Sequence, residues 1–286
     1  MARVPRRWVD ALNALCFTVL IPVLLFRLMA GIGHLPPVDA RLLLAYFGAC
    51  LVVFGLGRLV AARLYTLDGV GQSIFALGGV FSNNVLLGVP MARLLLGEAA
   101  MPAVALVLVF NALLLWTLVS VSVEWARHGA LSLHGFGKTA LGVLRNPIVA
   151  AIVLGAAYGL SFGDLPHGVD ALLAPVADAA GPVVLVALGL GLAQYPVRDA
   201  WRESVAITVL KLVALPLAVL LLARALALPP TETRAVVLLA SMAVGANVYL
   251  MARHFDRLHS AVASSLVLST AVAAVTTPLW LALVGG

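Results

Sequence analysis

Phe81-Ser82-Asn83-Asn84-Val85-Leu86-Leu87-Gly88-Val89-Pro90 lies in the middle of an apolar segment that runs from about residue 70 to about residue 97. Glycine tolerates almost any backbone geometry, and proline lacks an amide proton and clashes with the preceding helical turn. The stretch therefore predicts a membrane helix that is interrupted at its centre. Unwound backbone in hydrocarbon exposes amides that cost several kcal/mol each, so such a break persists only against protein or a wet cavity.

The rest of the chain has the composition of a membrane protein. Of its 286 residues, 63% are apolar and 10% are charged, whereas about a quarter of the residues in soluble proteins are charged. This composition excludes a soluble enzyme, a nucleic-acid-binding protein and a disordered chain. We predict an all-α polytopic membrane protein, because the sequence contains nine apolar segments of about the length that crosses a bilayer. They are residues 12–30, 40–62, 70–97, 101–123, 139–161, 170–194, 203–226, 232–254 and 260–284.

The distribution of basic residues predicts the orientation of these spans. With Lys211 left out because it falls inside a span, 12 Lys and Arg lie on one side of the predicted membrane and 5 on the other. Cytoplasmic loops carry the excess of basic residues, so we expect a cytoplasmic N-terminus and an external C-terminus in the cell (inner) membrane. The polar residues 124–138 form the longest linker, which we expect to be cytoplasmic. Cys16 and Cys50 lie in apolar runs and form no metal-ligand pattern, so we expect no metal and no cofactor.

The two halves of the chain resemble each other weakly. Asn84-Val85-Leu86-Leu87 is matched by Asn247-Val248-Tyr249-Leu250, and Pro22-Val23-Leu24-Leu25 by Pro182-Val183-Val184-Leu185. The two pairs are displaced along the chain by nearly the same interval. The members of each pair are five span positions apart, and this odd shift inverts the second copy. Inverted repeats with interrupted helices are typical of secondary transporters, whose substrates bind at the breaks. A single asparagine in a membrane more often packs helices together, but two at matching places favour a binding site.

These segments resemble the auxin efflux carrier family, which includes bacterial malate and malonate permeases. Residues 84–90 match the N-x-x-x-G-x-P segment of that family, and residues 242–249 match its counterpart in the second repeat. The resemblance extends from about residue 10 to the end of the chain. Further matching segments are Asn146-Pro147, residues 182–192 with Gly189, and residues 211–216.

The resemblance implies two inverted repeats of five helices, with crossed broken helices at the fourth and ninth positions. It also implies a scaffold domain, a moving transport domain, an elevator-like cycle and commonly a homodimer. Here the first family helix has no counterpart, so we expect a 4+5 arrangement with repeats at residues 1–123 and 139–286. Either the start codon is placed too far downstream or the chain is truly shorter. Ala243 replaces a frequent family proline, so we expect a less sharp second break, with Gly245 carrying the irregularity.

Two charged residues inside predicted spans are candidates for a role in function. Lys211 is about eight residues from the start of its span, where an ammonium is costly. It can attract an anionic substrate, neutralise carbonyls freed by a helix break, or extend to the headgroups. Asp178 is a candidate carrier of a coupling proton, although a solvated carboxylate at the outer end of its helix is the favoured explanation. The predicted substrate-binding residues are Asn84, Gly88, Pro90, Lys211, Gly245 and Asn247.

The resulting hypothesis is a permease that moves a small organic anion, such as a dicarboxylate or a weak organic acid, across the membrane. Its expected partners are that anion, the lipid bilayer and a second copy of the chain. One alternative is a non-transporting scaffold or regulatory protein. An intramembrane enzyme is disfavoured, because the chain lacks Gly-x-Ser-Gly and His-Glu-x-x-His, and none of its six histidines is deep in a predicted span. The substrate, the direction of transport and the coupling ion cannot be derived from these patterns.

Overall fold

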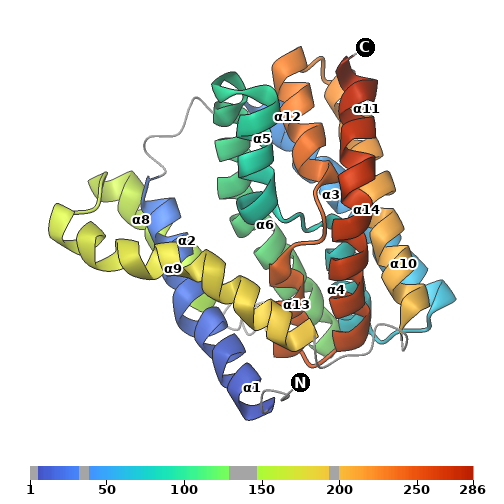
Figure 1. Ribbon diagram of the computed structural model, residues 1–286, viewed down its shortest axis with the longest axis horizontal. Coiled ribbons are helices and arrows are strands. Elements are labelled where there is room, and N and C mark those ends of the chain that lie inside the picture. Colours follow the sequence, from blue (N-terminus) through green and yellow to red (C-terminus); the bar gives the residue numbers. More distant parts are fainter. Residues whose placement is uncertain (1–5, 32–38, 129–146, 193–199, 286) are drawn as a thin grey trace. The chain divides into compact units, whose positions relative to one another are not determined.

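The computed structural model describes residues 6–31, 39–128, 147–192 and 200–285, and Figure 1 shows its helices. Within these ranges every regular element is a helix, and the one β-type contact is an isolated bridge. The chain divides into two compact units. The first unit comprises Met1–Leu35 and Ala112–Gln194, and the second comprises Pro36–Asn111 and Tyr195–Gly286. Each unit therefore combines segments from both halves of the sequence.

The first unit is organised around the packing of α2 on α8. Gly155 and Gly159 lie one turn apart on α8, and a Cβ at either position would collide with the backbone of α2 at Phe26 or Ala30. This is a Gly-x-x-x-Gly contact, in which small residues let two helix backbones approach closely. The helices of this unit are α1 (Arg6–Leu15), the π-helical η1 (Cys16–Leu20), α2 (Ile21–Ala30), α8 (Pro147–Phe162), α9 (His167–Leu192) and the C-terminal part of α6 (Met101–His128).

The second unit contains two interrupted helices and the helices that surround them. The first interrupted helix is α4 (Gly69–Val80) followed by the π-helical η3 (Asn84–Gly88) and α5 (Val89–Leu96). The second is α12 (Pro230–Ser241) followed by α13 (Ala246–His254). The surrounding helices are α3 (Ala40–Leu64), the 3-10 helix η4 (Glu98–Ala100), the N-terminal part of α6, α10 (Trp201–Val209), the π-helical η5 (Leu210–Ala214), α11 (Leu215–Ala225) and α14 (His259–Gly285).

The helices of the second unit recur along the chain at a constant interval. The helix α3 covers residues 40–64, and α10, η5 and α11 together cover residues 201–225, so that both ends are displaced by the same amount. The same displacement relates α4 to α12, which are both 12 residues long. It also relates the start of η4 at residue 98 to the start of α14 at residue 259. These helices of the second unit therefore have matching lengths and a constant spacing along the chain.

Three prolines inside helical segments each follow a π-helical turn. Pro22, Pro90 and Pro216 lie at the start of α2, α5 and α11, directly after η1, η3 and η5. A proline cannot donate to the carbonyl four residues earlier, and its ring clashes with that carbonyl, so the wider π turn accommodates it. For Pro216 that carbonyl belongs to Leu212, and the indole Nε1 of Trp280 donates to it at 2.8 Å.

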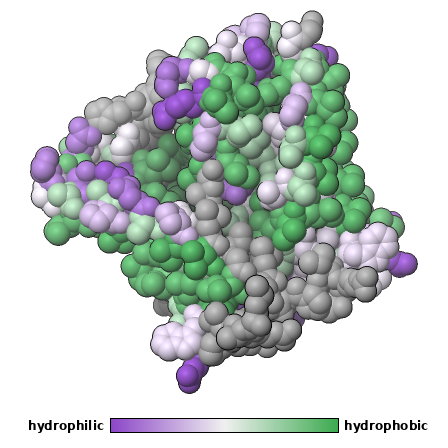
Figure 2. Space-filling model, in the orientation of Figure 1, coloured by the Kyte–Doolittle hydropathy of each residue, from purple (hydrophilic) through white to green (hydrophobic). Residues whose placement is uncertain are grey.

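Several helical stretches of the described chain have the length and composition of membrane spans. They are Arg7–Ala30, Ala40–Leu64, Glu98–Arg127, Trp201–Ala225 and His259–Gly285. Figure 2 shows apolar residues over broad areas of the visible surface, as expected for a protein that contacts lipid. The helix α6 continues through His128, so the beginning of the linker predicted at 124–138 is helical. The rest of that linker lies outside the described residues.

The contact between α2 and α8 provides a test of the first unit. We expect Gly159→Val to lower the melting temperature of the detergent-purified protein, because the added atoms collide with the backbone of α2 at Ala30. Overpacking costs about 1–3 kcal/mol, and about 2–4 °C are lost per kcal/mol in a protein of this size class. Gly168→Ala is the matched control, since a Cβ there meets no other atom. Equal melting of both variants would show that the two helices are not held by this contact.

Candidate functional site

The two helix interruptions of the second unit pair with each other. The first break is residues 81–83, between α4 and η3, and the second is residues 242–245, between α12 and α13. The amide of Asn83 donates to the carbonyl of Ala243 at 2.9 Å, and the amide of Gly245 donates to the carbonyl of Phe81 at 2.8 Å. Ser82 and Val244 thereby form an antiparallel bridge. Each break supplies partners for backbone groups that the other has lost from its helix.

Gly245 is required at this point because the two backbones approach closely. A Cβ on Gly245 would lie 2.8 Å from Cδ1 of Phe81 and 3.0 Å from the carbonyl oxygen of Ser82. The expectation of a less sharp second break was wrong. The helix α12 ends at Ser241, and Met242 and Gly245 are extended with ψ of 153° and 142°. Proline is unnecessary at Ala243 because the facing segment provides the hydrogen bonds that keep this backbone out of the helix.

The sequence suggested that Gly88 and Pro90 take part in the first break, but in the structure they lie outside it. The non-helical residues are Phe81, Ser82 and Asn83, whereas Gly88 ends the π-helical turn η3 and Pro90 is the second residue of α5. Gly88 is buried one turn after Asn84, and its own Cβ would lie 2.8 Å from Cδ2 of Leu239. Pro90 is exposed. The π turn accommodates the proline without unwinding the helix, so the break falls earlier, at the polar residues.

Asn84 and Asn247 both lie in the first turn of a helix that leaves the paired breaks. Asn84 is the first residue of η3 and Asn247 the second residue of α13. Asn84 is buried, and its Nδ2 donates to the hydroxyl of Tyr46 at 3.0 Å; that hydroxyl donates to Oγ of Ser82 at 3.4 Å. Asn247 is half-buried. The first amides of a helix point away from its own carbonyls, so both helices direct amides and partial positive charge toward the breaks. Some of these amides are capped locally, since Leu87 donates to Asn83 and Val248 donates to Gly245.

Lys211 is fully buried, and its Nζ donates to the carbonyl of Ala240 at 2.5 Å. Ala240 is the penultimate residue of α12, directly before the second break. Of the three roles considered for this lysine, the structure therefore shows a contact with a carbonyl at the end of a broken helix. The snorkelling interpretation is wrong, because the side chain is 0% exposed. Its contribution to attracting a substrate stays a prediction.

Asp178 lies in the first unit, on α9, and so outside the unit that contains both breaks. Its side chain is 75% exposed and lies 3.9 Å from Nη1 of Arg27. Arg27 itself is bound more closely by Asp170, with Nε 2.6 Å from Oδ1. Asp178 thus belongs to a different unit from the other predicted site residues, and its role in coupling stays a prediction.

Tyr46 and Thr277 contact the paired breaks and were not identified from the sequence. Tyr46 lies on α3 and connects Asn84 with Ser82, and Thr277 on α14 donates to the carbonyl of Ser241 at 3.0 Å. They lie 36 residues or more from their partners in the chain. A tyrosine or threonine inside an apolar segment has no pattern that indicates which distant backbone group it will reach.

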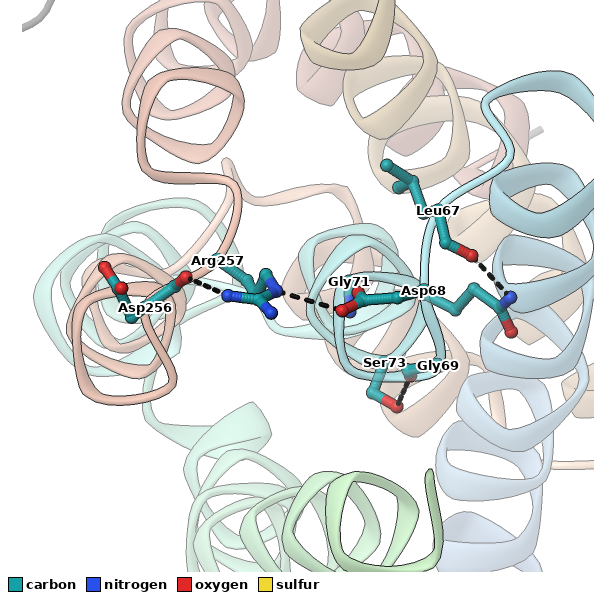
Figure 3. Close-up of polar contacts among 8 residues, drawn as sticks. Leu67, Asp68, Gly69, Gly71, Ser73, Asp256 and Arg257 are labelled. Carbon is teal, nitrogen blue, oxygen red and sulfur yellow. Dashed lines mark hydrogen bonds and ion pairs between the residues drawn. The ribbon is translucent and has the colours of Figure 1, made fainter. Parts of the chain in front are cut away.

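Figure 3 shows a polar cluster at the N-terminus of α4. Oδ1 of Asp68 accepts from the amide of Gly71 at 2.7 Å, and Oδ2 accepts from Nε of Arg257 at 3.0 Å. Partial burial raises the pKa of Asp68, but the Gly71 amide and the Arg257 guanidinium outweigh it, so the net shift of this pKa is downward. The cluster joins the start of α4 to the segment after α13.

The chain matches known membrane transporters along almost its whole length. A family model described as membrane transport protein matches residues 3–281. The chain therefore belongs to this family of membrane transporters, which confirms the resemblance to the auxin efflux carriers, and it is not an enzyme. Among its relatives is a Rhizobium meliloti (strain 1021) protein named "Putative malonate transporter", which is 27% identical over 277 residues. The alignment covers 94% of this chain and 86% of that protein.

The capping of α4 by Asp68 gives a pH-dependent prediction. A carboxylate whose pKa is lower in the folded state stabilises the fold above its ordinary pKa of about 4 and loses this effect as the pH falls. At pH 7 we expect the wild type to have the highest melting temperature, Asp68→Ser an intermediate one and Asp68→Ala the lowest, because serine keeps the cap without the charge. Loss of a helix cap costs about 1 kcal/mol. Below a pH of about 4 the wild type and Asp68→Ser should converge, and a difference that stays constant as the solution is acidified from neutral pH would contradict the assignment.

Proposed function

We propose that this chain is a secondary transporter that carries a small organic anion, such as a dicarboxylate, across the cell (inner) membrane. The observation that carries the proposal is the pairing of the two breaks through the Asn83–Ala243 and Phe81–Gly245 hydrogen bonds. Because the breaks are adjacent, two helices begin at the same place. Paired interrupted helices at a substrate site are the arrangement by which many transporters bind anionic groups.

The electrostatics of the paired breaks favour an anion. The N-terminal end of a helix carries the equivalent of about half a positive charge and offers unpaired amide donors. Both η3 with α5 and α13 present this end to the breaks. We propose that the amide groups of Asn84 and Asn247 add side-chain donors for a carboxylate, and that Gly88 and Gly245 allow the close packing that holds the two helix starts together.

The two units support an elevator-like cycle. Both breaks belong to the second unit, which we propose as the moving transport domain, and the first unit is proposed as the scaffold. The constant displacement between matching helices of the second unit supports an origin in two repeats. Inversion of the second repeat, nine membrane spans, a cytoplasmic N-terminus and a homodimer belong to the same proposal.

The substrate class follows from the relative and from the site together. Malonate is a dicarboxylate, and the Rhizobium meliloti protein carries malonate in its name. At 27% identity, and with a site built from backbone amides and asparagines, we propose a small dicarboxylate as the first candidate and a weak organic acid such as indole acetate as the second. Either anion supplies the carboxylate that the two helix ends favour.

The test begins with binding. Purified protein is heated with malonate, malate, succinate or indole acetate, and the melting temperature is compared with that in chloride alone. At a ligand concentration about 100 times Kd, mass action stabilises the folded state by about 2.7 kcal/mol, which raises melting by several degrees. We expect one of these acids to produce the shift, and the same acid to be taken up by proteoliposomes.

The site assignment is tested with two variants. Asn84→Ala and Asn247→Ala should each abolish both the shift and the uptake while retaining the helical circular dichroism of the wild type. Thr270→Ala is the matched control, because its hydroxyl bonds only within α14, to the carbonyl of Leu266, and it should retain at least half of the uptake. Normal uptake by both asparagine variants would refute the site, and a folded wild type that neither binds nor transports any acid would favour a non-transporting scaffold.

A further inference from the structure

The C-terminal end of α12 is the negative counterpart of the two positive helix ends at the breaks. The last four carbonyls of a helix have no partner inside it, and together they carry the equivalent of about half a negative charge. In α12 these carbonyls belong to residues 238–241, and each has a donor. Oγ of Ser241 donates to Leu238 at 2.8 Å and the amide of Met242 donates to Leu239 at 3.4 Å.

The remaining two carbonyls accept hydrogen bonds from side chains of other helices, and one of these side chains is a lysine. Thr277 of α14 donates to Ser241, and Lys211 of η5 donates to Ala240. The partner of Lys211 in the described part of the chain is thus a backbone carbonyl rather than a carboxylate. A fully buried ammonium without a carboxylate is costly, so the negative end of α12 is the feature that compensates it here.

The corresponding helix of the first half carries no charge at this place. The displacement that relates α3 to α10, η5 and α11 brings residue 50 onto residue 211. Residue 50 is a cysteine with a free thiol that is also fully buried. The two breaks thus have different side chains beside them: Tyr46 and Asn84 lie at the first, and the amino group of Lys211 lies at the second.

In transporters with interrupted helices, unwound carbonyls and the C-terminal ends of half-helices are the groups that coordinate a coupling cation. We propose that the ammonium of Lys211 is a built-in cation at the end of α12, and that its removal leaves a site for a free monovalent cation. This inference deepens the proposed function, because it assigns Lys211 to positioning the second broken helix rather than to contacting the substrate. A tethered ammonium stays with the protein throughout a cycle, whereas a free ion is bound and released.

The test compares melting in sodium chloride and in choline chloride at equal ionic strength, without any organic acid. Wild-type protein should melt at the same temperature in both salts, because its cation is covalently attached. Lys211→Ala should melt several degrees lower in choline and recover at least half of the loss in sodium, with a saturable dependence on concentration. Lys211→Met, which fills the space without a charge, should melt low in both salts.

Cys50→Ala is the matched control for an emptied side-chain position. It removes a buried side chain at the equivalent place of the first half but no charge, so its melting should not depend on the cation. Lys211→Arg keeps the charge and should melt closer to wild type than Lys211→Met does. An equal response of Lys211→Ala and Cys50→Ala to sodium would overturn the proposal, as would wild-type melting by Lys211→Met.

If Lys211→Ala cannot be obtained in folded form, the melting of the wild-type protein in the two salts is used as the test instead. Equal melting in the two salts then supports a built-in cation, and a saturable stabilisation by sodium overturns it. Because no organic acid is present, the result is independent of the proposed transport activity. Failure of malonate uptake in every salt, with the cation response of Lys211→Ala intact, would reject the transport function and leave the role of Lys211 standing.

Discussion

The second unit depends on one constraint, which is that backbone polar groups in an apolar surrounding must be paired. Two helices that break within a membrane each expose several amides and carbonyls, at a cost of several kcal/mol per group. Here two backbone hydrogen bonds between the breaks at residues 81–83 and 242–245 pair amides of each segment with carbonyls of the other. Side chains from α14 and η5 bind three further backbone groups, the amide of Val244 and the carbonyls of Ala240 and Ser241. Each break depends on the other, so the two interrupted helices and the helices around them form one structure.

In this arrangement the negative C-terminal end of α12 and the positive N-terminal ends of η3 and α13 have different partners. The C-terminal end of α12 is closed by Lys211, Thr277 and Ser241. The helices η3 and α13 instead start at the breaks with asparagine side chains in their first turns. In the function proposed above, a ligand at the breaks meets donors and partial positive charge, and Lys211 compensates the negative end of α12. This asymmetry is the physical basis for proposing an anion as the substrate.

Prolines contribute to this fold differently from what a simple breaking rule suggests. Pro90 and Pro216 follow π-helical turns. These turns are wide enough to accommodate the pyrrolidine ring of the proline, and the helix continues after them. The breaks lie instead at Phe81–Asn83 and at Met242–Gly245, where another backbone is available for pairing. In this protein the helices are therefore interrupted where another backbone segment can pair with them. A proline without such a segment is accommodated by a π-helical turn.

The sequence by itself determined that the chain is helical and apolar and which segments carry interruptions, because these properties follow from composition and local spacing. It predicted, from a weak internal similarity, that two asparagines occupy matching places in two halves. It also indicated the transporter family. Only the tertiary structure decided which residues unwind, that the second break is complete with Ala243 in it, and that Lys211 binds the end of α12. It also placed Tyr46 beside Asn84. Asp178, by contrast, was found to belong to the first unit. These outcomes depend on pairing between segments that are far apart in the chain, and the local sequence does not specify which distant group will be within hydrogen-bond distance.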